Sequence, residues 1–145
     1  MRSHLCLLLL TMSFAAAAAN PTAERGVALA NKDLEKSGSP YRWAVGEEKD
    51  GMSVMEKHLL GEPCTTVADA VLTSDTLANI GTAEARFEGS TSPQLLETRC
   101  VAPTRKSKGV KEIWVVARGE KQVPYVVVFH PDPKGGVTME ITGPW

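Results

Sequence analysis

Glu47, Glu48 and Asp50 form the densest cluster of acidic side chains in this sequence of 145 residues. Glycosidases cleave sugars with two facing carboxyl groups, so an acidic cluster raises the question of such chemistry. That catalysis would also need a pocket that raises the pKa of one carboxyl group. The three acids instead adjoin Asp50-Gly51, a dipeptide typical of a tight hairpin turn, where we expect no fixed pocket. We interpret them as solvated loop charges, with binding to a partner as the functional alternative.

The other residue types that carry out catalysis form no recognisable motif. After residue 19 the sequence has two histidines, His58 and His130, which are far apart and outside any H-E-x-x-H pattern. No G-x-S-x-G, S-x-x-K or Walker motif occurs. Gly135-Gly136 indicates a turn rather than a phosphate site, because no helix follows it. The sequence therefore predicts no catalytic residue, no metal site and no cofactor, and we expect the protein not to be an enzyme.

Residues 1–19 are typical of a signal peptide for export. Arg2 supplies the positive start, an apolar run follows from Leu5 to Phe14, and a series of alanines ends at Ala19. The apolar run is short for a membrane span and leads into polar sequence. We expect cleavage near Ala19, a periplasmic location and no membrane insertion of the remaining chain. A retained membrane anchor is the alternative.

Cleavage at that point leaves two cysteines, Cys64 and Cys100. An even pair in an exported chain favours one disulfide. A redox or nucleophilic thiol is the alternative, but the sequence has no C-x-x-C pair, and the residues next to Cys64 include no cation to stabilise a thiolate. We therefore predict a structural bridge between Cys64 and Cys100.

The composition is that of a globular protein, with 23% charged and 43% hydrophobic residues. The formal net charge of −1 argues against a protein that covers nucleic-acid phosphates, so we expect no nucleic-acid partner. The length that remains after cleavage suits one soluble domain over residues 20–145.

A helix is predicted to begin at Asn20 and Pro21, which supply a capping side chain and a preset φ angle. Gly38 and Pro40 would end it. Its apolar residues recur at helical spacing and are mostly small: Ala23, Val27, Ala30 and Leu34. This narrow stripe favours packing on a sheet, because a membrane-surface helix needs larger apolar residues and a basic face.

A first hairpin is predicted after the helix. Alternation from Tyr41 to Val45 indicates a strand, and Asp50-Gly51 indicates the turn. The segment from Met52 to Leu60 fits either the return strand or a helix, and the sequence leaves both open. Thr66, Asp69 and the apolar residues after them hint at a short helix near Cys64.

The rest of the sequence predicts antiparallel strands. Residues 83–88 and 95–102 alternate in polarity on either side of a loop, which indicates a second hairpin. Three further strands are expected to form a meander: 113–117, 123–130 and 137–142. The predicted fold class is α+β, with the N-terminal helix packed on a mostly antiparallel sheet of about six or seven strands that ends in this three-stranded meander.

The start of the exported chain, Thr22-Ala23-Glu24-Arg25-Gly26-Val27-Ala28-Leu29-Ala30-Asn31, and its end, Pro124-Tyr125-Val126-Val127-Val128-Phe129 through Gly143-Pro144-Trp145, carry a family resemblance. With the signal peptide, they resemble the periplasmic immunity proteins that protect a bacterium from its own type VI secreted muramidase. The resemblance implies that the protein binds the toxin in the periplasm and blocks its peptidoglycan cleft.

Contact residues do not follow from the resemblance and are predicted from loop position alone. Six polar residues on the predicted hairpin loops are the expected toxin contacts: Glu47, Glu48, Asp50, Ser90, Ser92 and Gln94. Their side chains can replace sugar hydroxyls or bind polar groups of the toxin.

Two other classes of function remain open. A periplasmic small-ligand or lipid-binding module would line the concave face of the sheet with aromatic residues: Trp43, Trp114, Tyr125 and Phe129. Packing in the core is the commoner use of such residues. A small cell-wall hydrolase would need a carboxylate in a pocket or a nucleophile beside a base.

Overall fold

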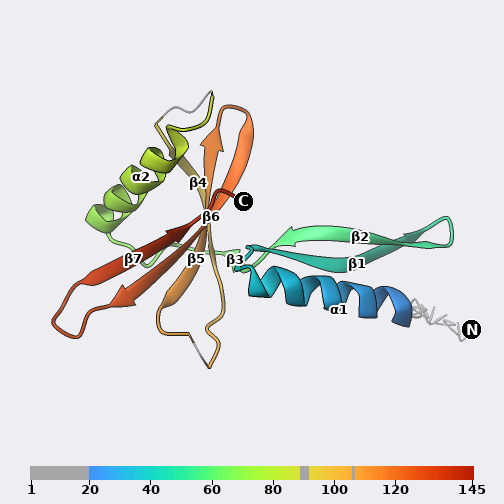
Figure 1. Cartoon of the computed structure of the whole chain (residues 1–145). Coiled ribbons are helices and arrows are strands. Elements are labelled where there is room, and N and C mark those ends of the chain that lie inside the picture. The colour runs from blue at the N-terminus through green and yellow to red at the C-terminus, as the bar shows by residue number, and fades with distance from the viewer. Residues whose placement is uncertain (1–19, 89–91, 106) are drawn as a thin grey trace, which may run out of the picture.

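The computed structural model describes residues 20–88, 92–105 and 107–145. The predicted signal peptide and Ser90 therefore lie outside the described residues. Within the described ranges the chain forms two helices and seven strands in two antiparallel sheets, which confirms the α+β class and the C-terminal meander. The strands are divided between a two-stranded and a five-stranded sheet rather than joined in one. Figure 1 shows an arm, made of α1, β1 and β2, that projects from a body made of the remaining elements.

Helix α1, Pro21–Lys36, begins as the sequence predicts. The side chain of Asn20 accepts hydrogen bonds from the backbone N–H groups of Thr22 and Ala23, at 3.1 and 3.3 Å, and Pro21 is the first helical residue. The helix ends at Lys36 because Gly38 adopts a φ angle of 73°, which side chains other than glycine rarely accept. Val27, in the middle of the predicted apolar stripe, is its buried residue.

Strands β1, Tyr41–Lys49, and β2, Met52–Leu59, form the hairpin of the arm. Asp50 and Gly51 have φ angles of 53° and 74°, both positive, as a type I′ turn requires. This turn sets the register that pairs the two strands. The sequence left the segment from Met52 to Leu60 as either a strand or a helix, and the structure shows a strand. Helix α1 packs along β1.

The body is a five-stranded sheet in the order β3-β4-β5-β6-β7. The strands are Glu62–Pro63, Gln94–Cys100, Val110–Arg118, Lys121–Pro131 and Val137–Thr142. Strands β5 to β7 are consecutive neighbours, which confirms the predicted meander. Strand β6 is buried from Val123 to Val127 and again at Phe129, and both of its edges are paired.

Helix α2, Ala70–Glu84, packs on the five-stranded sheet and corrects two predictions. The helix near Cys64 is longer than the short one expected. Residues 83–88 are not a strand, because Ala83 and Glu84 end the helix and a turn follows. The alternation over 83–88 is outweighed by the helical spacing of Thr76, Ile80 and Glu84, all of them buried. Ile80 joins a core that includes Trp114 and Phe129, whose ring centroids lie 6.2 Å apart.

Candidate functional site

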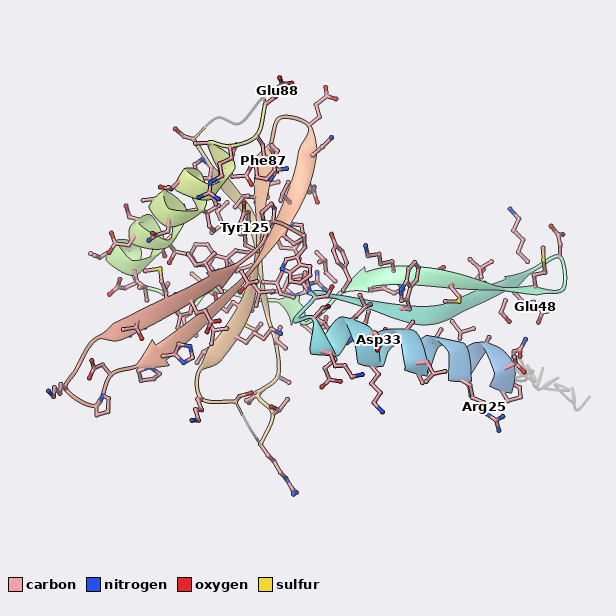
Figure 2. All side chains as sticks on the ribbon, in the orientation of Figure 1. Arg25, Asp33, Glu48, Phe87, Glu88 and Tyr125 are labelled. Atoms are coloured by element: carbon pink, nitrogen blue, oxygen red, sulfur yellow. A yellow bond between two sulfur atoms is a disulfide. The ribbon has the colours of Figure 1, made fainter. Side chains whose placement is uncertain are left out.

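The predicted acidic cluster lies at the far end of the arm. Glu47 and Glu48 end β1, Asp50 forms the turn, and all three are exposed. Figure 2 shows Glu48 at the tip, well away from the body. Within the described residues no ion pair or hydrogen bond involves these carboxylates. The three carboxylates are therefore accessible to another molecule.

Exposed apolar side chains accompany the acids along the arm. Met52 is 69% exposed and Met55 is 45% exposed, and Val45 and Val54 are also exposed. We call these four residues the arm patch. Val45 and Met55 are direct cross-strand partners. Side chains alternate between the two faces of a strand, so Met52 and Val54 lie on one face of the hairpin, and Met55 lies with Val45 on the other. The arm patch therefore presents apolar side chains on both faces of the hairpin, and exposed apolar residues rimmed by charged ones are typical of a protein-binding surface.

The remaining predicted contact residues lie elsewhere. Ser92 and Gln94 precede or begin β4, and Gln94 pairs with Ala117 in the body. The structure therefore brings together Glu47, Glu48 and Asp50 at the hairpin turn, whereas Gln94 begins β4, which lies in the body (Figure 1), and Ser92 is two residues before it. The sequence showed only that both groups adjoin predicted loops. It did not show that one loop lies at the tip of the arm and the other on the body.

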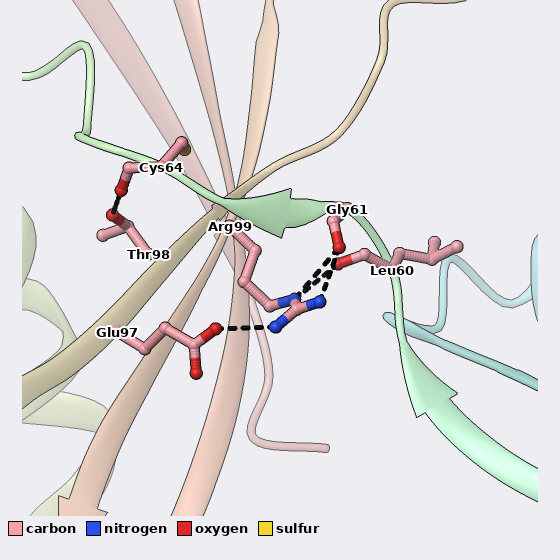
Figure 3. A network of polar contacts seen from close by, with 6 residues as sticks. All are labelled: Leu60, Gly61, Cys64, Glu97, Thr98 and Arg99. Atoms are coloured by element: carbon pink, nitrogen blue, oxygen red, sulfur yellow. Dashed lines mark hydrogen bonds and ion pairs between the residues drawn. The ribbon is translucent and has the colours of Figure 1, made fainter. Parts of the chain in front are cut away.

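Arg99 at the base of the arm was missed by the sequence reasoning. Its Nε donates to the carbonyl oxygens of Leu60 and Gly61, at 3.2 and 3.1 Å, and its Nη2 donates to Gly61 at 2.7 Å (Figure 3). Its Nη1 donates to Glu97 Oε1 at 2.6 Å. These bonds attach the end of the hairpin to β4 of the body. A strand pattern does not reveal such a role, because the acceptors are backbone groups nearly 40 positions away.

The predicted disulfide is present beside this junction. Cys64 and Cys100 are bonded, with their Cα atoms 5.7 Å apart. Thr98 Oγ1 donates to the carbonyl oxygen of Cys64 at 2.5 Å, and the short strand β3 pairs with β4 next to the bridge. The bridge and the Arg99 bonds together hold the segment that connects the arm to the body.

The two histidines lie on different parts of the molecule. His58 is on the arm, with its Nε2 3.3 Å from Glu56 Oε2, and His130 is on the body, with its Nε2 3.6 Å from Glu140 Oε2. Both pairs are largely exposed. Among the described residues, no group of three or more His, Cys, Asp or Glu side chains is placed to hold a metal ion.

A buried acid, Glu112, holds the segment after the disulfide. It accepts hydrogen bonds from Thr66 Oγ1, the Val67 backbone N–H and Trp114 Nε1, at 2.7, 2.8 and 2.7 Å. Its carboxylate is fully buried and has three donors, so its hydrogen-bonding capacity is largely used within the protein. This arrangement stabilises the fold and leaves no oxygen directed at a ligand site.

A second buried acid, Glu84, forms a network with Arg118 and Tyr125 inside the body. Arg118 donates from Nε and Nη2 to the two carboxylate oxygens, each at 2.5 Å, and the Tyr125 hydroxyl donates to Glu84 Oε1. The guanidinium carbon of Arg118 also lies 4.0 Å from the centre of the Phe87 ring. Hydrogen bonding to Arg118 lowers the pKa of Glu84, whereas burial, reinforced by Glu84, raises the pKa of Tyr125.

These shifts predict how the free energy of unfolding depends on pH. The unfolded state binds the Glu84 proton more tightly than the folded state, so stability falls as the pH drops below about 4.5. Tyr125 behaves oppositely. Its ordinary pKa is 10.0 and its folded pKa is higher, so stability falls as the pH rises above 10.0. Burial lowers the pKa of Lys111, which partly offsets this alkaline loss.

Urea unfolding from about pH 2 to pH 11 measures both effects. Glu84→Gln is expected to flatten the acid side of the profile, and Tyr125→Phe is expected to flatten the alkaline side. Profiles of the two variants that run parallel to wild type at both extremes would contradict the assignment.

The aromatic residues predicted to line a ligand-binding face are mostly core residues. Trp114, Tyr125 and Phe129 are buried between the sheet and α2, and Trp43 is on the arm. Tyr125 also borders an open depression of about 340 Å³ between α2 and β7. Its other lining residues are Asn79, Ala83, Met139, Ile141 and Gly143. The depression is open to solvent, so it does not enclose an apolar ligand as a lipid-binding cavity would.

Comparison with protein-family models, with curated proteins and with solved structures finds no match to this chain. Over residues 20–88, 92–105 and 107–145, no helix has both the length and the apolar character to cross a membrane. The disulfide is compatible with an exported protein.

Proposed function

We propose that this protein is an exported inhibitor without turnover of its own, and that it acts in the periplasm as the immunity protein of a type VI secreted muramidase. The observation that carries the proposal is the projecting arm, whose tip presents Glu47, Glu48 and Asp50 beside exposed apolar side chains. The arm is the element that enters the toxin's substrate cleft. The resemblance of both ends of the chain to such immunity proteins supports the same function.

The shape of the arm suits a cleft that binds an extended glycan. A two-stranded hairpin is narrow, with backbones roughly 5 Å apart, and a type I′ turn gives it a compact end. Arg99 and the disulfide hold its base, so little conformational freedom is lost on binding. The carboxylates at the tip replace polar groups of the glycan, and the arm patch supplies the apolar contact. A tight inhibitor buries roughly 800 Å² on each partner, which a domain of this size can provide.

An inhibition assay tests this function. The purified chain from residue 20 onward is mixed with a purified type VI muramidase effector encoded beside its gene, and the clearing of a peptidoglycan suspension is followed by turbidity. We expect clearing to stop at equimolar inhibitor. In cells, protection against the effector directed to the periplasm should require residues 1–19. Peptidoglycan cleavage by the chain alone, or unhindered clearing in its presence, would refute the proposal.

Changes at the tip should weaken inhibition without unfolding the protein. Replacing Glu47, Glu48 and Asp50 together with alanine removes exposed charges, each worth less than about 0.5 kcal/mol of stability. If the tip is an anchor, the same change costs at least about 2 kcal/mol of binding, which is roughly thirtyfold in affinity.

Calorimetric titration against the effector measures this loss. The matched control replaces Asp75, Glu88 and Glu120 with alanine, because these are exposed acids on the body, away from the arm. This control should bind as wild type does. Equal affinities of the tip variant and wild type would exclude the tip as the anchor.

The alternative function is binding of a small ligand, which the depression beside Tyr125 favours. A ligand there would contact the Asn79 amide at the rim and the side chains of Met139 and Ile141. Titration with an anilinonaphthalene dye discriminates the two functions. A dye that binds wild type but not Ala83→Trp would support the ligand binder.

A further inference from the structure

The arm and the body are joined by one passage of the chain. Helix α1 and strands β1 and β2 all precede residue 60, and every element of the body follows residue 61 (Figure 1). The connection therefore consists of Leu60, Gly61 and the two residues of β3. In the described part of the chain, no hydrogen bond or ion pair joins residues 20–59 to the body. The polar attachment of the arm lies in this connection.

The body end of the connection is fixed. Cys64 is bonded to Cys100, and its N–H donates to the carbonyl oxygen of Thr98 at 3.0 Å. The Thr98 hydroxyl donates back to the carbonyl oxygen of Cys64. The buried carboxylate of Glu112 holds the segment that follows. Rotation of the arm against the body is therefore confined to residues 60–63.

Strand β3 holds the connection only weakly by itself. Its two residues, Glu62 and Pro63, are both exposed. Its ladder with β4 has two pairs, Glu62 with Cys100 and Pro63 with Arg99, and a proline has no N–H group to donate. Segments with little buried apolar surface and exposed backbone hydrogen bonds open at a low free energy. A further contact is therefore needed to keep the arm in one direction.

Gly61 is the point where the connection turns against the body. Its φ angle is 76°, and a Cβ atom at this position would lie 2.4 Å from the carbonyl oxygen of Cys100. Backbone therefore packs directly on backbone here, which a side chain would prevent. A small residue between two elements can also absorb large changes of φ and ψ, as hinge residues do.

Arg99 supplies the further contact on the arm side of this turn. Its Nε and Nη2 atoms donate to the carbonyl oxygens of Leu60 and Gly61, and hydrogen bonds from a charged donor are stronger than those between neutral groups. Glu97 accepts from Nη1 and so orients the guanidinium group. The Arg99 side chain is 20% exposed, so these bonds are partly shielded from water.

We propose that the arm is a hinged unit that turns about residues 60–63, and that the Arg99 guanidinium group is the latch that fixes its direction. With the latch closed, the arm and the body form one rigid unit. With the latch open, the short ladder of β3 gives way, and the arm turns while its own helix and hairpin stay together. The inference goes beyond the proposed function, because it concerns the freedom of the arm to move, whatever the arm binds.

Residual dipolar couplings of the backbone amides test the proposal on the intact protein. These couplings report the direction of each N–H bond in an aligning medium, so two units that move independently require two different alignment tensors. We expect one tensor to fit the arm and the body together in wild type. Arg99→Gln should lose this single fit and require a separate tensor for each unit. Chemical shifts of β2 and β6 that stay close to those of wild type show that both units remain folded.

Matched variants separate the latch from other causes. Arg86→Gln removes an exposed arginine from the body and should keep the single tensor. Glu97→Gln removes the charge beside Arg99 but leaves the bonds to the two carbonyl oxygens, so it should keep the single tensor as well. Gly61→Ala forces the connection away from Cys100 with Arg99 in place, and it should require two tensors.

The remaining outcomes overturn the proposal. A single tensor for the arm and the body of Arg99→Gln would exclude Arg99 as the latch. Two tensors in wild type would exclude it too, because the arm would then move freely with Arg99 in place. Loss of the wild-type shifts of β6 in Arg99→Gln would show that Arg99 supports the fold of the body rather than the direction of the arm.

Discussion

Replacing Arg118 with glutamine is expected to lower the free energy of unfolding by roughly 3–5 kcal/mol at neutral pH. Glu84 is 1% exposed, and Arg118 supplies its charge partner and two of its hydrogen bonds. Without the guanidinium group, the carboxylate stays buried with the Tyr125 hydroxyl and no cation beside it. The loss is large because a buried charge without a partner costs more than the ion pair itself contributes. Urea unfolding at neutral pH measures the difference.

Three controls make this result specific to the network. Arg86 is exposed near the same end of α2, and Arg86→Gln should cost less than about 0.5 kcal/mol. Adding Glu84→Gln to Arg118→Gln removes the buried charge and should recover much of the stability. The cost of Arg118→Gln should also shrink in acid, where Glu84 is protonated. A cost that is the same at acidic and neutral pH would show that packing, rather than charge, is lost.

Loss of the disulfide is expected to have an effect of similar size. Cys64 and Cys100 are 36 positions apart, and the closed loop contains α2 and most of β4. In the chain-entropy description, a loop of roughly 37 residues contributes about 4 kcal/mol by restricting the unfolded chain. The variant with both cysteines replaced by serine should therefore have a free energy of unfolding lower by about that amount, and its urea midpoint should fall accordingly.

Reduction provides the matched comparison. Wild type in reductant should approach the stability of the serine variant, and the serine variant should not respond to reductant. Intact mass before and after alkylation checks the bond itself in protein expressed with residues 1–19 and recovered from the periplasm. Two alkylated thiols without prior reduction would contradict the bridge in the exported protein.

Local signals in the sequence predicted much of the fold. Asn20 and Pro21 determine the start of α1, because capping and a preset φ act within one turn of helix. Asp50-Gly51 determines the hairpin turn, because few residue pairs accept two positive φ angles. The alternation after residue 110 predicted the meander. The pair Cys64 and Cys100 followed from counting, since no other cysteine remains after the predicted signal peptide.

Contacts between distant residues could not be predicted in this way. The end of α2 replaces the strand expected at residues 83–88, because Glu84 is held by Arg118 and Tyr125, which lie 34 and 41 positions later. Burial of this network outweighs a short alternation in polarity. The role of Arg99 could not be predicted either, because it donates to the backbone carbonyls of Leu60 and Gly61, and every residue has such a carbonyl whatever its type.

For the candidate site, too, some features follow from local sequence and others only from the tertiary structure. The sequence by itself determined that Glu47, Glu48 and Asp50 adjoin a tight turn, since turn chemistry is local. Only the tertiary structure decided that this turn ends a projecting arm, and that Gln94 and the nearby Ser92 lie apart from it, at the start of β4 in the body. Likewise, only packing decided that the Asn31 side chain of α1 hydrogen-bonds to both backbone groups of Trp43. Which backbone groups are satisfied depends on elements brought together in space, and side-chain patterns do not encode it.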